Sequence, residues 1–383
     1  MAQPNDESLN RAWNFGAGPA AIPVSVLREA QASMLDYAGS GMSVMELSHR
    51  SKEYETIHNA AIEDLRRLLD VPEEYAVLFV QGGGSTMFAS VVYNLLGSGD
   101  KVVDYFVTGA WSEKAAQEAK LLGAQVNTVI NTKSGKFRSI TSKSEWTLSA
   151  PEKTAYAYYC MNETVHGVEW FETPEVDPSV PLVCDASSTI LSRPIPIRRH
   201  ALIYAGAQKN IGPSGVTVVI VRKDLLGARP FLHPVPLMLN FKTYADANSL
   251  YNTPPTWGIY VSGLVFKWLL GLGGLEGMEA INTRKASKLY AALDAYPKLF
   301  QAPVAGPVRS RMNVVWRVLG EDGQPSDELE KEFLKGAEAR RMVQLKGHRS
   351  AGGIRASIYN AVPEEGVDAL VAWVEEFAKK SRA

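Results

Sequence analysis

The sequence predicts a layered α/β protein with a mostly parallel central sheet and a second, smaller α/β domain. Short apolar runs alternate with helical patterns over the first 275 of its 383 residues. Most of these runs are continuous β-branched or aromatic stretches, as is typical of strands buried on both faces. A glycine-rich stretch at 271–277 then separates them from a different order of helices and strands.

The predicted strands define the larger domain, which we place at 24–275. They lie at 76–81, 101–107, 125–130, 155–160, 182–185, 202–206 and 216–222. Helical patterns at 53–69 and 112–122 fall between them. The second pattern begins at Ser112, a favourable N-cap, and stops at Gly123, which suits the position after a helix end. This alternation of strand and helix favours parallel pairing of most strands.

A smaller domain is predicted at 276–383, with residues 1–23 packing on it. After a long helical pattern, two strand–helix pairs are expected at 312–318, 327–341, 354–359 and 367–377. Asp327 and Glu330 fit a capping box at the start of the first of these two helices. The last helix carries an apolar stripe that predicts a core face, formed by Val367, Leu370, Val371, Val374 and Phe377.

Composition and charge argue against several classes of protein. A formal net charge of −1 gives no electrostatic argument for nucleic acid or an anionic membrane, so an anionic ligand would need a local basic cluster. The N-terminus lacks the pattern of a signal peptide, and the apolar stretch at 261–275 is too short to span a bilayer. Cys160 and Cys184 predict buried free thiols, not a disulfide framework or a zinc site. We expect a soluble cytoplasmic protein without a metal.

Lys209 is the strongest candidate for chemistry. It stands among small residues between a predicted strand and a Gly/Pro turn, in the segment YAGAQKNIGPSG (204–215). A lysine amine is a good Schiff-base nucleophile when desolvation or nearby cations lower its pKa. Asp185 ends a buried run 24 residues earlier, at the sheet edge where ligands bind, and could keep the ring nitrogen of pyridoxal phosphate protonated. A solvated lysine and a turn-capping aspartate are the alternatives.

A glycine-rich turn and a tryptophan could hold the rest of such a cofactor. The turn QGGGST (81–86) follows a strand and opens a helical pattern, so its N–H groups and the helix dipole favour an anion. It matches neither a nucleotide P-loop nor Gly-x-Gly-x-x-Gly. Trp111 could stack on an aromatic ring. A tight turn and a core tryptophan are the simpler interpretations.

Two basic groups could bind the anionic ends of a substrate. His348, Arg349 and Arg355 lie in a glycine-rich loop that leads into a strand, and His49 and Arg50 form a second pair near the start of the chain. Guanidinium groups bind carboxylates and phosphates through two parallel hydrogen bonds. Either group alone suits a solvated face, whereas both together suit a phosphate-bearing substrate.

The motifs resemble those of the phosphoserine aminotransferases, a family of class V, fold-type I pyridoxal-phosphate aminotransferases. The similarity covers nearly the whole chain in order. It rests on FGAGPA (15–20), ELSHRSKEY (46–54), QGGGSTMF (81–88), TGAWSEKA (108–115), NETVHGVE (162–169), CDASS (184–188), GAQKNIGPSG (206–215), YNTPPTW (251–257) and GHRSAGGIRASIYNA (347–361). The resemblance implies the fold-type I architecture, with a large cofactor-binding domain and a smaller C-terminal domain.

The resemblance also implies roles around the cofactor, pyridoxal 5'-phosphate. Lys209 would form the Schiff base and move the proton between the substrate's α-carbon and the cofactor. Asp185 would pair with the ring nitrogen, Trp111 would stack on the ring, and Thr164 would hydrogen-bond the phenolic oxygen. The residues expected around the cofactor phosphate are Gly84, Ser85, Gln208 and, from a neighbouring subunit, Asn252 and Thr253. A site shared in this way implies a homodimer.

The implied reaction is the reversible transfer of the amino group from L-glutamate to 3-phosphohydroxypyruvate, giving O-phospho-L-serine and 2-oxoglutarate in serine biosynthesis. Arg355 would bind the substrate α-carboxylate. The distal phosphate or carboxylate would be bound by His49, Arg50, His348 and Arg349. The same pocket could serve 4-phosphohydroxythreonine in vitamin B6 synthesis. Some relatives carry an arginine where Ser85 stands, and serines where Gly16 and Ala17 stand, so those contacts are missing here.

Three other functions fit the sequence less well. A cysteine desulfurase needs a reactive cysteine on a mobile loop, whereas both cysteines lie in or beside predicted strands. A serine–glyoxylate or alanine–glyoxylate aminotransferase would share Lys209 and Asp185 without needing the pair His348 and Arg349. A binding protein that has lost catalysis would lack the lysine or the aspartate, and both are present.

Overall fold

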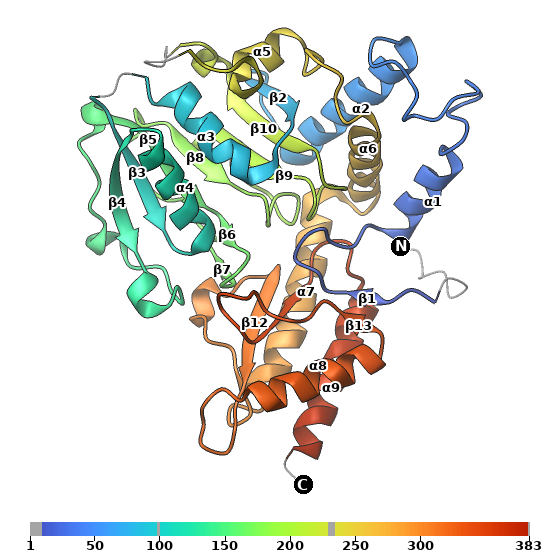
Figure 1. Ribbon diagram of the computed structural model, residues 1–383, viewed down its shortest axis with the longest axis vertical. Coiled ribbons are helices and arrows are strands. Elements are labelled where there is room, and N and C mark those ends of the chain that lie inside the picture. Colours follow the sequence, from blue (N-terminus) through green and yellow to red (C-terminus); the bar gives the residue numbers. More distant parts are fainter. Residues whose placement is uncertain (1–9, 98–99, 229–233, 382–383) are drawn as a thin grey trace.

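The computed structural model describes residues 10–97, 100–228 and 234–381 (Figure 1). Its centre is a seven-stranded sheet in the order β2-β10-β9-β8-β5-β3-β4. The strands are β2 (Tyr75–Val80), β3 (Val102–Val107), β4 (Gln125–Asn131), β5 (Thr154–Cys160), β8 (Leu182–Asp185), β9 (Leu202–Gly206) and β10 (Thr217–Arg222). All neighbours are parallel except that β10 is antiparallel to β2 and β9. The predicted α/β fold with a mostly parallel sheet is confirmed, and in this sheet each predicted strand end is within one residue of the observed one.

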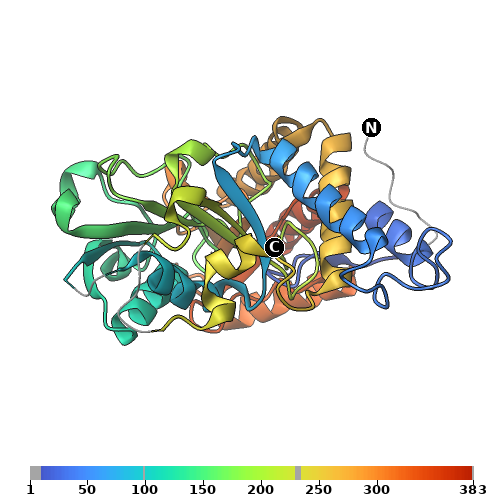
Figure 2. The same ribbon diagram turned by 90° about the horizontal axis from the view of Figure 1, so that it is seen from above.

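Helices cover both faces of this sheet (Figures 1 and 2). One core contains side chains of α2 (Lys52–Leu69) and α6 (Thr256–Gly271), and the other contains those of α3 (Gly83–Leu95), α4 (Ala110–Leu121) and α5 (Phe241–Asp246). Neighbouring strand residues alternate between the two cores: in β10, Val218 and Ile220 face α2 and α6, whereas Val219 and Val221 face the other layer. Burial on both faces explains why the strands are continuous apolar runs.

The smaller part of the fold has its own core. It contains α7 (Gly274–Asp294), α8 (Asp327–Ala339) and α9 (Glu364–Lys380), beside an antiparallel sheet of β11 (Phe300–Gln301), β12 (Asn313–Val318) and β14 (Ile354–Ser357). Near the N-terminus, β1 (Trp13–Asn14) pairs in parallel with β13 (Met342–Val343), and Phe15 is fully buried in this core. Residues 1–9 of the segment expected to pack here lie outside the described residues. The predicted stripe of α9 does face this core, although Val371 is only partly buried.

Two predicted helix caps are wrong by one to three residues. Helix α4 begins at Ala110, and Ser112 is inside its first turn, where its Oγ accepts hydrogen bonds from the N–H of Thr108 (3.0 Å) and Gly109 (3.2 Å). In α8, Ser326 rather than Asp327 is the N-cap, since its Oγ accepts from Leu329 N–H (3.3 Å). In both cases a second hydroxyl or carboxylate group can also bind the free N–H groups at the helix start. The sequence pattern alone does not show which of the two groups does so.

Among the described residues, the remaining α-helix is α1 (Val24–Ala32), and the remaining strands, β6 (Asn162–Glu163) and β7 (Val168–Glu169), form a hairpin. Cys160 and Cys184 are buried free thiols, as predicted. Within the described ranges, no single helix is long and apolar enough to cross a membrane, and α6 and α7 meet such a test only as a pair bent by 83°. No three His, Cys, Asp or Glu side chains of the described residues gather into a metal site.

Candidate active site

The site lies at one edge of the large sheet, where the carboxyl ends of its strands meet. Strands β3, β5, β8 and β9 are parallel, and β2 runs in the same direction because both it and β9 are antiparallel to β10. Asp185 is the last residue of β8, and the segments after the other strands carry Trp111, Thr164, Lys209 and the Gly82 turn. The strand order therefore brings together side chains that are far apart in the sequence, at the edge where open α/β sheets bind ligands.

These segments enclose a cavity of about 260 Å³, the cofactor cavity. Nine of the predicted site residues line it, namely Gly84, Ser85, Trp111, Thr164, Asp185, Gln208, Lys209, His348 and Arg355. The segment FGAGPA (15–20) forms one side of the cavity. In this segment Gly18 has φ +136, and a Cβ on it would lie 3.3 Å from Gln208 Cγ and 3.5 Å from Lys209 Cγ. Its backbone can therefore lie directly against the lysine.

Lys209 is positioned by Thr164 and Trp111. Its Nζ donates a hydrogen bond to Thr164 Oγ1 (2.6 Å) and lies 5.9 Å from the centroid of the Trp111 ring. Burial lowers the pKa of the Lys209 amine, and the nearby Arg355 lowers it further, whereas Asp185 opposes the shift. A lowered pKa increases the fraction of neutral amine at neutral pH, which is the form that acts as a nucleophile or a base.

Asp185 is a fixed, buried carboxylate. Its side chain is 5% exposed, Oδ1 accepts from Ser187 N–H (2.9 Å), and Oδ2 accepts from the Tyr204 hydroxyl (3.1 Å). Ser187 Oγ in turn accepts from Gly206 N–H (3.1 Å), and the Tyr204 and Tyr158 hydroxyls are 2.7 Å apart. The carboxylate also lines the cofactor cavity, so it can form an ion pair with a protonated ring nitrogen there.

The start of α3 supplies backbone donors on the other side of Asp185. Gly82 and Gly83 have φ values of 101 and 66, which favour glycine, and Gly83 N–H donates to Thr217 Oγ1 (2.9 Å). The next N–H groups, of Gly84 and Ser85, belong to the first turn and have no acceptor within the helix. Both residues line the cavity, so the donors and the positive end of the helix dipole suit a phosphate.

Glu163 is a functional residue that the sequence did not reveal. It is fully buried and accepts hydrogen bonds from Trp111 N–H (2.9 Å), Ser112 N–H (2.9 Å) and Ser112 Oγ (2.5 Å). A Cβ on Gly109 would lie only 2.2 Å from Glu163 Cδ, so Gly109 leaves the room that the carboxylate occupies. Glu163 therefore fixes the start of α4, and with it the backbone of Trp111. The only sequence signal was an acidic residue directly before Thr164.

We expect Glu163→Gln to change how stability depends on pH. Burial raises the pKa of Glu163 from 4.5 to about 7, although hydrogen bonds from Ser112 and Trp111 oppose the shift. Between these pH values the folded chain keeps a proton that the unfolded chain has released, so Glu163 makes the fold less stable as pH rises through this window. The melting temperature of the wild type relative to the variant should fall between about pH 4.5 and about pH 7. An unchanged difference would contradict this assignment.

Arg355 faces the cavity with unsatisfied donors. Its Nη1 donates to Thr164 O (3.4 Å), and among the described residues its buried Nε has no partner. Burial lowers the pKa of Arg355. Because a buried donor without an acceptor is costly, the side chain is suited to a carboxylate that enters the cavity. His348, also at the cavity, hydrogen-bonds Ser350 Oγ through Nδ1 (2.7 Å).

Five predicted site residues do not line the cofactor cavity of the same chain. They are His49, Arg50, Asn252, Thr253 and Arg349. All are exposed except His49, which is partly buried and whose Nε2 has no partner among the described residues. Arg349 is the neighbour of a cavity residue, whereas the other four lie on the loop before α2 and on the segment before α6. The fold of one chain therefore does not bring the two basic groups together.

The cavity fits pyridoxal phosphate in its donor set. It offers a buried carboxylate for the ring nitrogen and a lysine of lowered pKa for the carbonyl group. The free N–H groups at the start of α3 suit the phosphate. The indole Nε1 of Trp111 is buried without a partner in the described part of the chain, and its ring borders the cavity. The ring nitrogen, the carbonyl group and the phosphate of the cofactor thus each have a matching group in the cavity.

Comparison with known proteins gives concordant results. The family model "Aminotransferase class-V" matches residues 12–370. The phosphoserine aminotransferase of Ectopseudomonas mendocina (strain ymp) is 52% identical over 371 residues, which cover 97% of this chain and 99% of that protein. The structure of phosphoserine aminotransferase from Bacillus circulans subsp. alkalophilus matches with a TM-score of 0.91 and 47% identity, covering 97% of this chain and 99% of that one. A PLP-bound phosphoserine aminotransferase from Trichomonas vaginalis matches with a TM-score of 0.88 and 41% identity, covering 95% and 100%.

Proposed function

We infer the function from the family: this chain belongs to the class-V aminotransferases, and it transfers the amino group of L-glutamate to 3-phosphohydroxypyruvate. The products are O-phospho-L-serine and 2-oxoglutarate, and the reaction serves serine biosynthesis. The cofactor is pyridoxal phosphate. The observation that carries the assignment is the cofactor cavity, in which Lys209 lies beside Asp185 and Arg355.

Lys209 is the proposed proton carrier of the reaction. When bound, pyridoxal phosphate supplies a carbonyl carbon for the amino group and an electron sink for the charge left on the amino acid's α-carbon. The neutral amine of Lys209 removes the proton from that α-carbon and returns one to the acceptor. Thr164, which accepts the hydrogen bond from Nζ, holds the amine in place while it is free.

The other cavity residues bind and orient. Asp185 keeps a proton on the ring nitrogen by ion pairing, and its bonds to Ser187 and Tyr204 prevent it from turning away. We propose that the backbone N–H groups of Gly84 and Ser85, with Gln208, bind the cofactor phosphate, and that Trp111 stacks on its ring. Since Glu163 holds the backbone of Trp111, it positions the stacking ring without touching the cofactor.

The substrate is proposed to lie between two sets of basic side chains. Arg355 binds the α-carboxylate, because its free donors face the cavity next to Lys209. His348 and Arg349 bind the distal phosphate or carboxylate, which requires the exposed Arg349 side chain to turn toward the cavity. The alternation between glutamate and phosphoserine then needs one distal site that accepts two anions of different size.

We further propose a homodimer whose sites are shared between subunits. His49, Arg50, Asn252 and Thr253 do not line the cavity of their own chain, and we propose that they act on the cavity of a partner. An exposed apolar group precedes them, with Met34 38%, Leu35 85%, Met42 43% and Met45 52% exposed. The sedimenting mass should be twice that of the 383-residue chain. A monomeric mass would contradict the proposal.

Three finer proposals complete this assignment. We propose that residues 24–275 form the large domain and 276–383 with 1–23 the small one, which limited proteolysis between them would test. Two buried free thiols favour a reducing, cytoplasmic location, which cell fractionation would test. The same pocket is proposed to accept 4-phosphohydroxythreonine, and a rate equal to that with threonine would exclude it.

The distal-anion role is tested by assaying L-phosphoserine and L-serine, each with 2-oxoglutarate, on wild type and Arg349→Ala. The variant should lose about 10- to 100-fold in kcat/KM with phosphoserine, the value of a charged hydrogen bond, and little with serine. Arg67→Ala, which removes an exposed arginine of α2, is the matched control and should change neither rate. Similar rates on both amino acids, unaffected by Arg349→Ala, would leave an aminotransferase but overturn its specificity for phosphoserine.

A further inference from the structure

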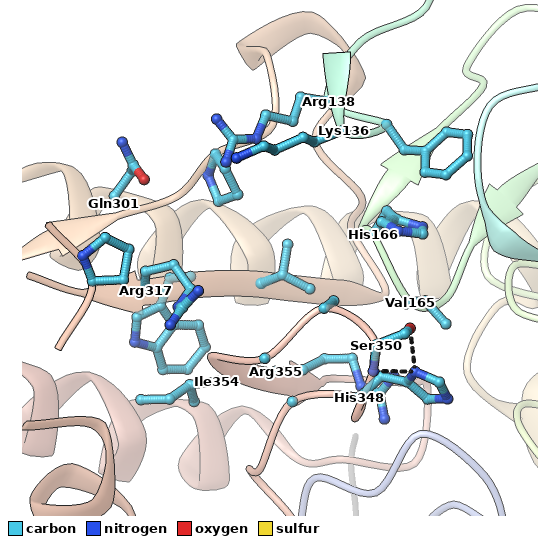
Figure 3. A pocket seen from close by; sticks show the side chains of 18 of the residues that line it. Lys136, Arg138, Val165, His166, Gln301, Arg317, His348, Ser350, Ile354 and Arg355 are labelled. Carbon is cyan, nitrogen blue, oxygen red and sulfur yellow. Dashed lines mark hydrogen bonds between the residues drawn. The ribbon is translucent and has the colours of Figure 1, made fainter. Parts of the chain in front are cut away.

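A second cavity lies beside the cofactor cavity and has no role in the proposed reaction. It encloses about 370 Å³ between the segment after β4, the hairpin of β6 and β7, strand β12 and the loop that precedes β14 (Figure 3). We call it the basic cavity, because Lys, Arg and His side chains line it and no Asp or Glu of the described part of the chain does. The two cavities share Val165, His348 and Arg355.

Three of its cations, Lys136, Arg138 and Arg355, have no carboxylate partner among the described residues. Lys133 pairs with Glu113 (2.7 Å), and Arg317 pairs with Glu330 (2.5 Å). Among the described residues, no carboxylate forms an ion pair with Lys136 or Arg138, which lie side by side above the cavity in Figure 3. Arg355 lies on the opposite wall, below them in that view. Cations that face each other across a cavity repel unless an anion lies between them.

Two buried nitrogen atoms of the same cavity have no hydrogen-bond partner among the described residues. Arg355 Nε and His166 Nδ1 are both buried and, within the described residues, have no hydrogen-bond partner. Burial lowers the pKa of His166 to about 4 and also lowers the pKa of His348, so both rings are neutral at neutral pH. A neutral imidazole still donates one hydrogen bond, and a buried donor without an acceptor is unfavourable. An anion in the cavity would meet these donors.

The walls of the basic cavity are held by backbone contacts and packing. Ala305 N–H donates to Arg138 O (2.8 Å), and Ser310 N–H donates to Gly167 O (2.9 Å), so both the segment after β4 and the hairpin are fixed to the smaller core. The Phe137 and His166 rings pack 4.7 Å apart between centroids. The cavity is therefore a built feature of the fold, with its cations brought from three separate segments.

We propose that the basic cavity is a second site for a compact polyanion, a phosphate compound or a polycarboxylate, bound by Lys136 and Arg138 together with Arg355. The effect of this binding on transamination rests on the proposed function. Because Arg355 also binds the substrate α-carboxylate, an anion in the basic cavity competes with the amino acid. Filling the cavity then inhibits transamination by raising KM for glutamate, with kcat unchanged.

The test uses pyrophosphate and citrate as probes on the cofactor-loaded enzyme. Binding is measured by titration calorimetry at constant ionic strength, so that general screening does not vary. The test variant is Lys136→Gln with Arg138→Gln. The matched control is Lys153→Gln with Arg199→Gln. These two side chains are at least as exposed as Lys136 and Arg138, and they lie near the starts of β5 and β9, at the opposite edge of the sheet. The comparison of the two probes shows whether phosphate or carboxylate is preferred.

The test variant should bind the preferred probe about tenfold more weakly or worse, as expected for lost charged hydrogen bonds, while the control matches the wild type. Its KM for glutamate should be normal without the probe and should rise less than that of the wild type with it. Arg349→Ala should weaken phosphoserine binding and leave probe binding intact. Equal probe affinity in the test variant and the wild type, or no probe binding by the wild type, would overturn the second site. Failure of the phosphoserine assay alone would overturn only the proposed function.

Discussion

Lys209→Ala should reduce transamination by about 10⁴-fold or more, the largest effect expected of any single substitution in this chain. The variant loses both the amine that bonds covalently to the cofactor and the base that moves the α-proton. No other described lysine lines the cofactor cavity, so none can replace it. Borohydride treatment followed by mass spectrometry should show the cofactor attached to the wild type and absent from the variant. Attachment to the variant would show that a different lysine reacts.

The same variant can test the shared site of the proposed dimer. His49→Ala with Arg50→Ala should also be inactive, because the partner's distal anion contacts are lost. Mixed dimers of the two inactive proteins contain one site with both defects and one intact site. An equal mixture, exchanged and refolded together, should therefore recover about a quarter of wild-type activity if subunits pair at random. No recovery would show that His49 and Arg50 serve their own chain.

Asp185→Asn should lower kcat by about 10²- to 10³-fold, as expected when a preorganised charge is removed from a buried site. Asparagine has the same shape: its Oδ1 can still accept from Ser187 N–H, and its Nδ2 can donate to the Tyr204 hydroxyl oxygen, so the loss reports mainly on charge. The variant should still bind the cofactor covalently through Lys209. Its effect therefore differs from that of Lys209→Ala in the covalent step as well as in size.

The matched control for this variant is Asp104→Asn. Asp104 is also a buried aspartate of the same sheet, 2% exposed, but it accepts hydrogen bonds from Asn127 and Ser149 and does not line the cofactor cavity. It should lower the melting temperature and leave kcat unchanged. If both variants lose activity in proportion to stability, Asp185 has a structural role only.

The fold was predictable because buried strands have a distinctive sequence pattern. Strands covered on both faces are continuous apolar runs, and the ends of β8 and β9 were located without error. That result also placed Asp185 and Lys209 at one sheet edge, since the carboxyl ends of parallel strands lie together. Helix caps were less predictable, because Ser112 lies three residues inside a helix whose start is fixed by Glu163, 51 residues away.

The rest of the site could not be derived from residue patterns. Thr164 and Gln208 came from family resemblance, because neither a lone threonine nor a lone glutamine has a distinctive pattern. Glu163 was missed for the same reason, as its partners are set by the tertiary fold. In the single chain, His49 and Arg50 also do not line the cavity whose substrate they were predicted to bind. A sequence lists these side chains but not the subunit on which they act.

Helix α7 belongs to both parts of the molecule. Its first turns place Leu275 and Met278 in the core beneath the large sheet, and its later turns place Leu289 and Leu293 in the core of the smaller part. Cutting the chain at the glycine-rich stretch would therefore remove apolar side chains from the core of the large part and leave them exposed on the smaller part. The two parts are not interchangeable modules. A chimaera that joins the large part of this chain to the small part of a relative should fold only when it inherits α7 and both of its contact surfaces together.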